Sequence, residues 1–156
     1  MTTCSFTGHR DIPESNIPVL EGLLERAVDY LYKNGVRRFC LGGAVGFDTL
    51  AAKVVLRLKM KCPDVQLFLI LPCQDQDGSW NERDREMYSY ILKCADEIEY
   101  VSDIYTKGCM KKRNQRLVEL CDVLVAYSYK ERSGSAQTVR MANEAGKTVY
   151  NLYGKR

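Results

Sequence analysis

The chain has 156 residues, a formal net charge of +3, 46% hydrophobic residues and 28% charged residues. This composition is typical of one globular domain spanning 1–156 and does not favour disorder. The small net charge is well below that of a dedicated nucleic-acid-binding protein, so nucleic acid is not the expected partner.

Seven cysteines and a single histidine limit the expected metal and redox chemistry. The cysteine number is odd and no Cys-x-x-Cys pair occurs, so we expect neither a disulfide framework nor a metal site. We interpret the thiols as small hydrophobic side chains in a reducing compartment. The sequence starts with a short strand rather than a secretory leader, and no apolar run approaches the about 20 residues that cross a bilayer. A cytoplasmic protein without a membrane partner is expected.

The first half of the chain alternates between strands and helices. Apolar residues at helical spacing mark the helices, and continuous apolar runs mark strands that are buried on both faces. Asn34-Gly35 and Pro72 mark two of the points where elements end. In chain order we expect a strand over 4–6, a helix over 20–31, a strand over 36–41, a helix over 48–58 and a strand over 65–71.

The second half repeats the alternation after a polar loop over 73–79. Asn81 is suited to cap a helix, with Asp84 three residues later, and Gly146 ends the last helix. In chain order we expect a helix over 82–94, a weak strand over 97–101, a helix over 109–121, a strand over 122–127, a helix over 134–145 and a strand over 148–152.

Strands that alternate with helices imply right-handed crossovers and a parallel sheet. We therefore predict a three-layer, Rossmann-like α/β domain, with a mostly parallel sheet of five to six strands and helices on both faces. Sheets of this kind bind ligands beyond the carboxyl ends of their strands, near a switch in strand order. The residues that follow the strands are therefore the candidates for a functional site.

The first candidate segment is Thr7-Gly8-His9-Arg10, which follows the first strand. Glycine permits a tight turn or a close backbone approach, and the Arg10 guanidinium is suited to hold a phosphate through two hydrogen bonds. His9 is the single histidine of the chain, and it is either a functional imidazole or an ordinary turn residue.

The second candidate segment is the glycine-rich turn Gly42-Gly43-Ala44-Val45-Gly46-Phe47-Asp48-Thr49. Glycines between a strand and a helix start expose N–H groups, and the helix dipole adds to their attraction for an anion. The pattern is neither the dinucleotide fingerprint nor a Walker loop. Asp48 is suited to accept a hydrogen bond from a ribose hydroxyl. Alternatively, the segment is a structural turn in which Asp48 caps the helix.

The third candidate segment is Ser133-Gly134-Ser135-Ala136-Gln137-Thr138, where small and hydroxyl residues begin the last helix. Such a helix N-terminus suits a phosphate, although Ser133 is equally suited to be a simple N-cap. Arg113 and Asn114 belong to a basic run from Lys111 to Arg116, which either reaches the same sheet edge or forms a solvated face.

The loop after the third strand contributes two more candidates, Gln76 and Trp80. The Trp80 ring is suited either to stack on a base or to shield the edge of the core, and we favour the core role.

In this order, the segments resemble the YpsA-like branch of the SLOG superfamily, which also includes the DNA-processing protein DprA and the LONELY GUY phosphoribohydrolases. The resemblance runs from about Thr3 to Leu152. It implies a Rossmann-like fold and a site for a nucleotide or nucleotide-derived ligand. It also implies that this site is lined by Gly8, Arg10, Gly42, Gly43, Asp48, Arg113, Asn114, Gly134 and Thr138.

The chain departs from the LONELY GUY pattern at its last turn. Those enzymes carry P-G-G-x-G-T-x-x-E, whereas here the position of the glutamate falls near Arg140 or Met141. The acidic group for ribosyl chemistry is missing, so a phosphoribohydrolase of that type is not expected.

Three functions are compatible with these residues. The first is a sensor or regulatory module that binds a nucleotide-like phosphate ligand and requires no cofactor. The second is a hydrolase of N-glycosidic or phosphate ester bonds, with Asp48 and His9 as candidate acid/base groups. The third is a nucleic-acid or protein adaptor that uses the run from Lys111 to Arg116. Abundant tyrosines and the family likeness favour a homodimer.

The residues expected to bind the ligand come from all of the candidate segments. They are Thr7, Gly8, His9, Arg10, Gly42, Gly43, Ala44, Gly46, Asp48, Thr49, Gln76, Trp80, Arg113, Asn114, Ser133, Gly134, Ser135 and Thr138.

Overall fold

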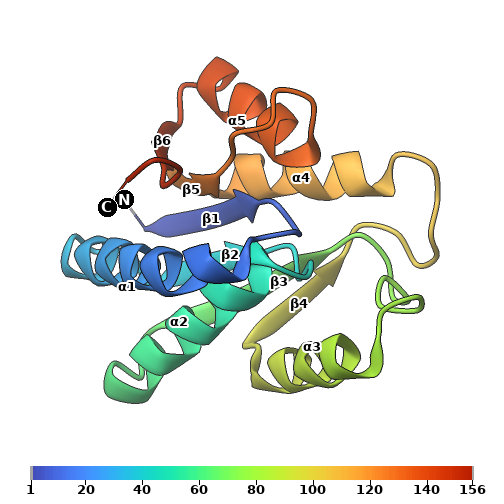
Figure 1. The fold of residues 1–156 in the computed structure, drawn as a ribbon, viewed down its shortest axis with the longest axis horizontal. Helices are drawn as coiled ribbons and strands as arrows, with labels where there is room; N and C mark the ends of the chain where they lie inside the picture. The colour runs from blue at the N-terminus through green and yellow to red at the C-terminus, as the bar shows by residue number, and fades with distance from the viewer. Residues whose placement is uncertain (1, 156) are drawn as a thin grey trace.

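The computed structural model describes residues 2–155, in which six parallel strands lie between two layers of helices (Figure 1). The predicted three-layer α/β fold with a parallel sheet is confirmed. In chain order the elements are β1 (Thr3–Gly8), the 3-10 helix η1 (Glu14–Asn16), α1 (Ile17–Lys33), β2 (Arg38–Leu41), α2 (Phe47–Lys61), β3 (Gln66–Leu71), α3 (Glu82–Cys94), β4 (Glu97–Tyr100), α4 (Cys109–Leu120), β5 (Val123–Tyr127), α5 (Gly134–Glu144) and β6 (Thr148–Asn151).

The strand order is β4-β3-β2-β1-β5-β6, so the direction of winding reverses between β1 and β5. These two strands pair in parallel, with Gly8 opposite Tyr127 at their carboxyl ends. The turn after β1 and the segment after β5 therefore leave the sheet side by side. In an open parallel sheet, this switch point is where a crevice forms.

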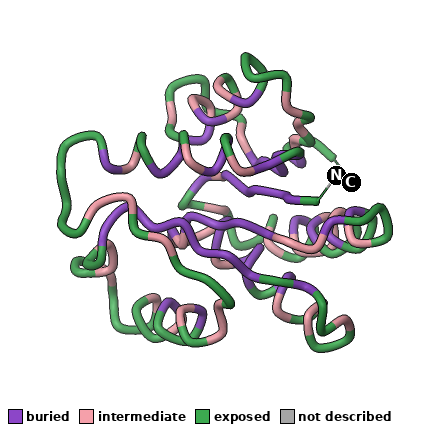
Figure 2. Tube along the Cα trace, turned by 180° about the vertical axis from the view of Figure 1, so that it is seen from behind, coloured by how far each residue is buried: buried purple, intermediate pink, exposed green. Residues whose placement is uncertain are grey.

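Alternating side chains divide the core into two faces. Phe6 and Phe39 project toward α1 and α2, and their ring centroids lie 6.2 Å apart. Cys40 and Ile70 project to the opposite face, where they pack against Leu117 of α4. As Figures 1 and 2 show, α1, α2 and α3 cover one face, α4 and α5 cover the other, and the buried segments run through the strands between them.

The element boundaries differ from the predicted ones by a few residues. The first helix begins at Ile17 rather than Leu20, because Pro18 fits the first turn, where no backbone N–H is needed. The second strand begins at Arg38, because the N–H groups of Arg37 and Arg38 both donate to the carbonyl of Thr2 just outside the sheet.

The structure also bears on membranes, metals and thiols. Within residues 2–155, no helix is long and apolar enough to cross a membrane, and no three His, Cys, Asp or Glu side chains gather into a metal-binding group. All seven cysteines are free, and five of them are buried.

Candidate functional site

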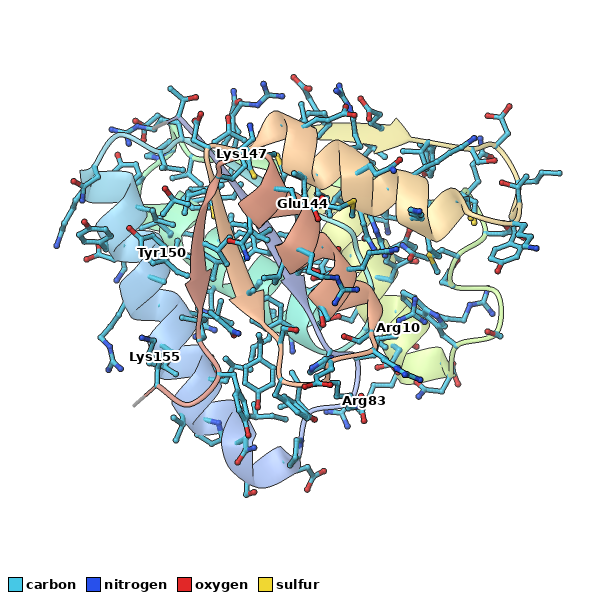
Figure 3. The ribbon with its side chains drawn as sticks, turned by 90° about the horizontal axis from the view of Figure 1, so that it is seen from above. Arg10, Arg83, Glu144, Lys147, Tyr150 and Lys155 are labelled. Carbon is cyan, nitrogen blue, oxygen red and sulfur yellow. The ribbon has the colours of Figure 1, made fainter. Side chains whose placement is uncertain are left out.

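A cleft of about 390 Å³ opens where β1 and β5 end. Its walls come from the turn after β1, the start of α2, one face of α4 and the N-terminus of α5. In Figure 3, Arg10 lies near the N-terminal end of α5. The predicted site residues that line the cleft are Thr7, Gly8, His9, Arg10, Ala44, Asp48, Arg113, Asn114, Ser133, Gly134 and Ser135.

Seven other predicted site residues lie outside this lining. Gln76 Nε2 donates to the carbonyls of Gly42 and Gly43, at 3.3 and 3.5 Å. The Trp80 ring packs edge-on against Tyr88 at the border of the core, with their centroids 5.0 Å apart. This position agrees with a core role for Trp80.

The remaining residues outside the lining shape local backbone. The hydroxyl of Thr49 donates to the carbonyl of Ala44 at 3.2 Å. The hydroxyl of Thr138 donates to the carbonyl of Gly134 at 2.8 Å within α5. Both contacts fix segments whose other residues line the cleft.

The glycines of the turns permit close packing between segments. A Cβ atom at Gly8 would overlap the Phe47 ring, and one at Gly42 would overlap the Arg113 guanidinium. Gly46 has φ of +79°, and its Cβ would overlap the carbonyl of Arg10. These contacts match the structural-turn interpretation for Gly42 and Gly46.

Asp48, in the first turn of α2, is 7% exposed and lines the cleft. Its Oδ2 accepts a hydrogen bond from the N–H of Ala44 at 3.2 Å. Its Oδ1 is buried and has no hydrogen-bond partner within residues 2–155. Burial raises the pKa of Asp48 to about 6, although the positive charge of Arg113 opposes this shift. One carboxylate oxygen thus holds the turn, and the other is left unpaired.

Arg113 on α4 is a buried cation that also lines the cleft and is 7% exposed. Its Nη1 donates to the carbonyl of Gly42 at 2.6 Å, and its Nε donates to Asn114 Oδ1 at 2.8 Å. Its Nη2 meets only the sulfur of Met110, at 3.8 Å. No carboxylate of the described chain lies within 4.0 Å of Arg113, so burial lowers the pKa of Arg113 despite the attraction of Asp48.

The N-terminus of α5 forms the third polar wall. The Ser133 hydroxyl accepts from the N–H of Ala136 at 3.1 Å, so Ser133 is the N-cap. The N–H groups of Gly134 and Ser135 donate to no acceptor in the part of the chain that the structure describes. Asn114 Nδ2 lies 3.7 Å from the position that a Cβ at Gly134 would occupy. The free amides and the positive end of the helix dipole attract an anion.

His9 connects the segment after β5 to α5. Its Nε2 accepts from the N–H groups of Tyr129 and Lys130, at 3.0 and 3.4 Å. Its Nδ1 lies 3.2 Å from the Ser135 hydroxyl, so this network assigns the ring proton to Nδ1. Burial, followed by the charge of Lys130, lowers the pKa of His9 below its usual value of 6.5. Both nitrogens are already used in holding the loop.

We expect protonation of His9 to weaken the folded state. The depressed pKa means that the unfolded chain binds the proton more tightly, so the His9 contribution to stability is complete above pH 6.5 and falls as the pH is lowered below it. The measurement is urea unfolding of the wild type and of His9→Gln from pH 5 to 8. A difference between the two proteins that does not change with pH would contradict this role.

Sequence reasoning missed Asp11, Met110, Lys130 and Arg132 among the polar and flexible residues of the cleft. Lys130 pairs with Asp11 at 3.1 Å. Lys130 and Arg132 lie between β5 and α5. Their position directly after a central strand could have identified them as candidate site residues. Arg10 and Arg132 make no ion pair with any carboxylate of residues 2–155.

The basic run from Lys111 to Arg116 does not form one solvated face. Arg113 and Asn114 turn inward to the cleft, whereas Arg116 pairs with Glu99 at 2.8 Å and with Glu119 at 3.6 Å. Little unpaired charge is left on this side of α4 beyond Lys111 and Lys112.

The comparison with protein families decides the relationship. The family model YpsA, described as the YspA SLOG family, matches residues 8–153 of the chain. The chain belongs to the YpsA family of SLOG proteins. The match covers the cleft residues from Gly8 onward, including those of α4 and α5.

Proteins similar to this YpsA-family chain are found in Bacillus and related bacteria. A UPF0398 protein of Bacillus thuringiensis (strain Al Hakam) is 26% identical over 139 residues, covering 88% of this chain and 76% of the relative. The UPF0398 protein BH1768 of Halalkalibacterium halodurans is 29% identical over 121 residues, covering 76% of this chain and 64% of the relative.

Solved structures share the fold. DNA processing protein A (DprA) from Streptococcus pneumoniae superposes with a TM-score of 0.69 at 18% identity, and the match covers 96% of this chain but only 50% of DprA. DprA from Helicobacter pylori, whose structure describes a single-stranded DNA binding mode, gives 0.67 at 23% identity, with 95% and 63% covered. TM1055 gives 0.66 at 19% identity, with 99% and 75% covered.

Proposed function

We propose that the cleft binds a nucleotide or nucleotide-derived ligand and that the protein acts as a sensor or regulatory module. The observation that carries this proposal is a pair of buried, oppositely charged side chains in one cleft, each with a hydrogen-bonding atom that no oxygen or nitrogen of the described chain satisfies. Asp48 has a carboxylate oxygen without a partner, and Arg113 has a guanidinium nitrogen whose one partner is the Met110 sulfur.

The two charges select a ligand with two kinds of group. A phosphate satisfies the Arg113 guanidinium and the amides of Gly134 and Ser135, which are all donors. A phosphate beside Asp48 would instead add like-charge repulsion. The Asp48 carboxylate is suited to accept a hydrogen bond from a donor such as a sugar hydroxyl. Leaving buried polar atoms unpaired costs about 1–3 kcal/mol each, and a ligand with both groups removes that cost.

A binding role fits the site better than a hydrolytic one. The His9 imidazole is held at both nitrogens by the loop and by Ser135, so it is not free to act as a base. The likeness in fold to a protein with a DNA-binding mode agrees with a nucleotide as the ligand. The homodimer stays a prediction, which sedimentation of the protein at two concentrations tests.

Calorimetry with the full chain tests the proposal. The panel comprises AMP, ADP, ATP, ADP-ribose, NAD and ribose 5-phosphate. Replacing Arg113 with methionine removes the buried cation while keeping much of its length, and we expect affinity to fall at least about tenfold because a charge-assisted hydrogen bond is lost. The matched control is Arg116→Met on the same helix, where the guanidinium pairs with Glu99 outside the cleft.

Circular dichroism of each variant separates lost binding from lost folding. Arg132→Gln removes a more exposed cation of the cleft and provides a second test that leaves the buried network in place. A folded wild type that binds no member of the panel at millimolar concentration would overturn the proposal.

The second candidate function is hydrolysis of a nucleotide, and one observation favours it. A carboxyl group with a pKa of about 6 is suited to exchange a proton near neutral pH. The test is release of base or phosphate from the same panel by the wild type and by Asp48→Asn. Release that is at background, or that is unchanged in Asp48→Asn, contradicts the hydrolase.

A further inference from the structure

Two half-exposed tyrosines lie where the sheet ends at β5 and β6. Tyr129 is 39% exposed and Tyr153 is 51% exposed. Their ring centroids lie 4.8 Å apart with an interplanar angle of 31°. Both rings rest edge-on against the buried ring of Tyr127, at 5.9 Å each. We call Tyr129 and Tyr153 the tyrosine ledge. The support from Tyr127 fixes the ledge in place although its rings reach solvent.

The ledge adjoins the candidate cleft. The Ser135 hydroxyl at the start of α5 lies 3.2 Å from His9 Nδ1, and the His9 ring centroid lies 4.4 Å from that of Tyr129. The Nζ atom of Lys130, a residue that lines the cleft, lies 5.7 Å from the Tyr129 ring centroid. Only the width of one imidazole therefore separates the anion-attracting helix start from the aromatic rings.

An apolar groove continues from the ledge on its other side. It has a volume of about 570 Å³ and lies between α1 and the segment after β6. Tyr127 and Tyr153 line it together with Val19 and Leu23 of α1. Val19 is exposed, so the groove is open to solvent. This edge of the sheet thus has a polar half in the cleft and an apolar, aromatic half in the groove.

We infer that the tyrosine ledge is a stacking platform for a nucleobase, so that the ligand class is a purine nucleotide rather than a sugar phosphate. This inference rests on the proposed function. With a phosphate at the start of α5, the base of the same ligand reaches past His9 and Lys130 toward the ledge. Aromatic side chains bind the flat faces of bases, and exposed rings offer such a surface. Purines present the larger face, so they are expected to bind more tightly than pyrimidines.

The experiment compares ligands that share a phosphate and a sugar but differ in the base. Calorimetry with the full chain uses AMP, GMP, CMP and ribose 5-phosphate. We expect AMP and GMP to bind at least about tenfold more tightly than ribose 5-phosphate, since one stacked base contributes about that factor or more. In Tyr129→Ala/Tyr153→Ala this preference should fall to less than about twofold, with the affinity for ribose 5-phosphate retained.

Two further variants serve as controls. Tyr129→Phe/Tyr153→Phe keeps the rings and should keep the preference for AMP, which distinguishes stacking from a hydroxyl contact. Tyr30→Ala removes a tyrosine on α1 that is 54% exposed and outside all of these contacts, and it should change nothing. Thermal melts verify that each variant is folded.

The outcomes separate this inference from the proposed function. Equal affinity of the wild type for AMP and ribose 5-phosphate overturns the inference that a base stacks on the ledge, and it leaves the proposed function standing. A preference for AMP that survives loss of both rings also overturns it, because the base then lies elsewhere. A change in sedimentation of the double alanine variant, without a change in binding, assigns the ledge to an interface between copies and overturns the inference. Absence of any binding overturns the proposed function itself.

Discussion

Replacing Asp48 with asparagine is expected to raise the free energy of unfolding by about 3 kcal/mol at pH 8. Burial raises the pKa of Asp48 from 3.8 to about 6, so the native state binds the proton more tightly than the unfolded chain does. The wild type therefore loses stability as the pH rises from 3.8 to 6 and stays at the lower level above pH 6. Asparagine carries no charge and keeps an oxygen to accept from the N–H of Ala44.

Urea unfolding of the two proteins at pH 8 and pH 4 checks this expectation. The difference should nearly vanish at pH 4, where the native carboxyl group is protonated. Asp103→Asn is the matched control, because Asp103 is exposed and should show little effect at either pH. We also expect Asp48→Asn to bind the nucleotide panel at least about tenfold more weakly, so that stability is gained as function is lost. An Asp48→Asn protein that is no more stable than the wild type at pH 8 would contradict the assigned burial cost.

Gly46→Ala is expected to have the largest destabilising effect, about 3–5 kcal/mol. Gly46 has φ of +79° and ψ of −118°, a backbone conformation that residues with a Cβ rarely adopt. The added methyl group would also overlap the backbone carbonyl of Arg10, which has no rotamer with which to move away. The turns after β1 and β2 would have to separate, and the cleft would lose its shape.

Chemical denaturation measures this loss, and a second glycine calibrates it. Gly22 lies within α1, and a Cβ there would meet no atom within 4 Å. Gly22→Ala should stabilise the protein by up to about 1 kcal/mol, because alanine favours a helix over glycine. If Gly46→Ala lowered the free energy of unfolding by less than about 1 kcal/mol, the contact between the two turns would be less rigid than the structure indicates.

Much of the fold and part of the cleft followed from local sequence patterns. Apolar runs and turn residues predicted all six strands and five helices within a few residues, because a parallel sheet that is covered on both faces makes its central strands largely apolar. The edge strand β4 is mostly exposed and gave only a weak signal. The carboxyl ends of parallel strands meet at one edge, so Gly8 and Gly134 were expected to approach one another although 125 residues lie between them. Both of them line the cleft.

Other features depend on tertiary packing that no local pattern encodes. A run of cations resembles a solvated face, yet Arg113 turns inward because Gly42, without a side chain, leaves room for its guanidinium. A glycine-rich turn suggests free amides, but here Asp48 accepts from the N–H of Ala44. The tyrosine ledge depends on the meeting of Tyr129 and Tyr153, which are 24 residues apart, around the ring of Tyr127.

The central position of β1 has a consequence for the newly made chain. In the folded protein β1 pairs with β2, which follows it closely in the chain, and with β5, which begins only at Val123. Until β5 has been made, one edge of a buried, apolar strand stays open, and such an edge is prone to pair with a strand of another molecule. The carboxylate of Asp122, just before β5, accepts from the N–H groups of Thr2 and Thr3. These hydrogen bonds hold the start of β5 against the start of β1. The cleft is thus complete only after synthesis has passed the start of α5, which forms one of its walls.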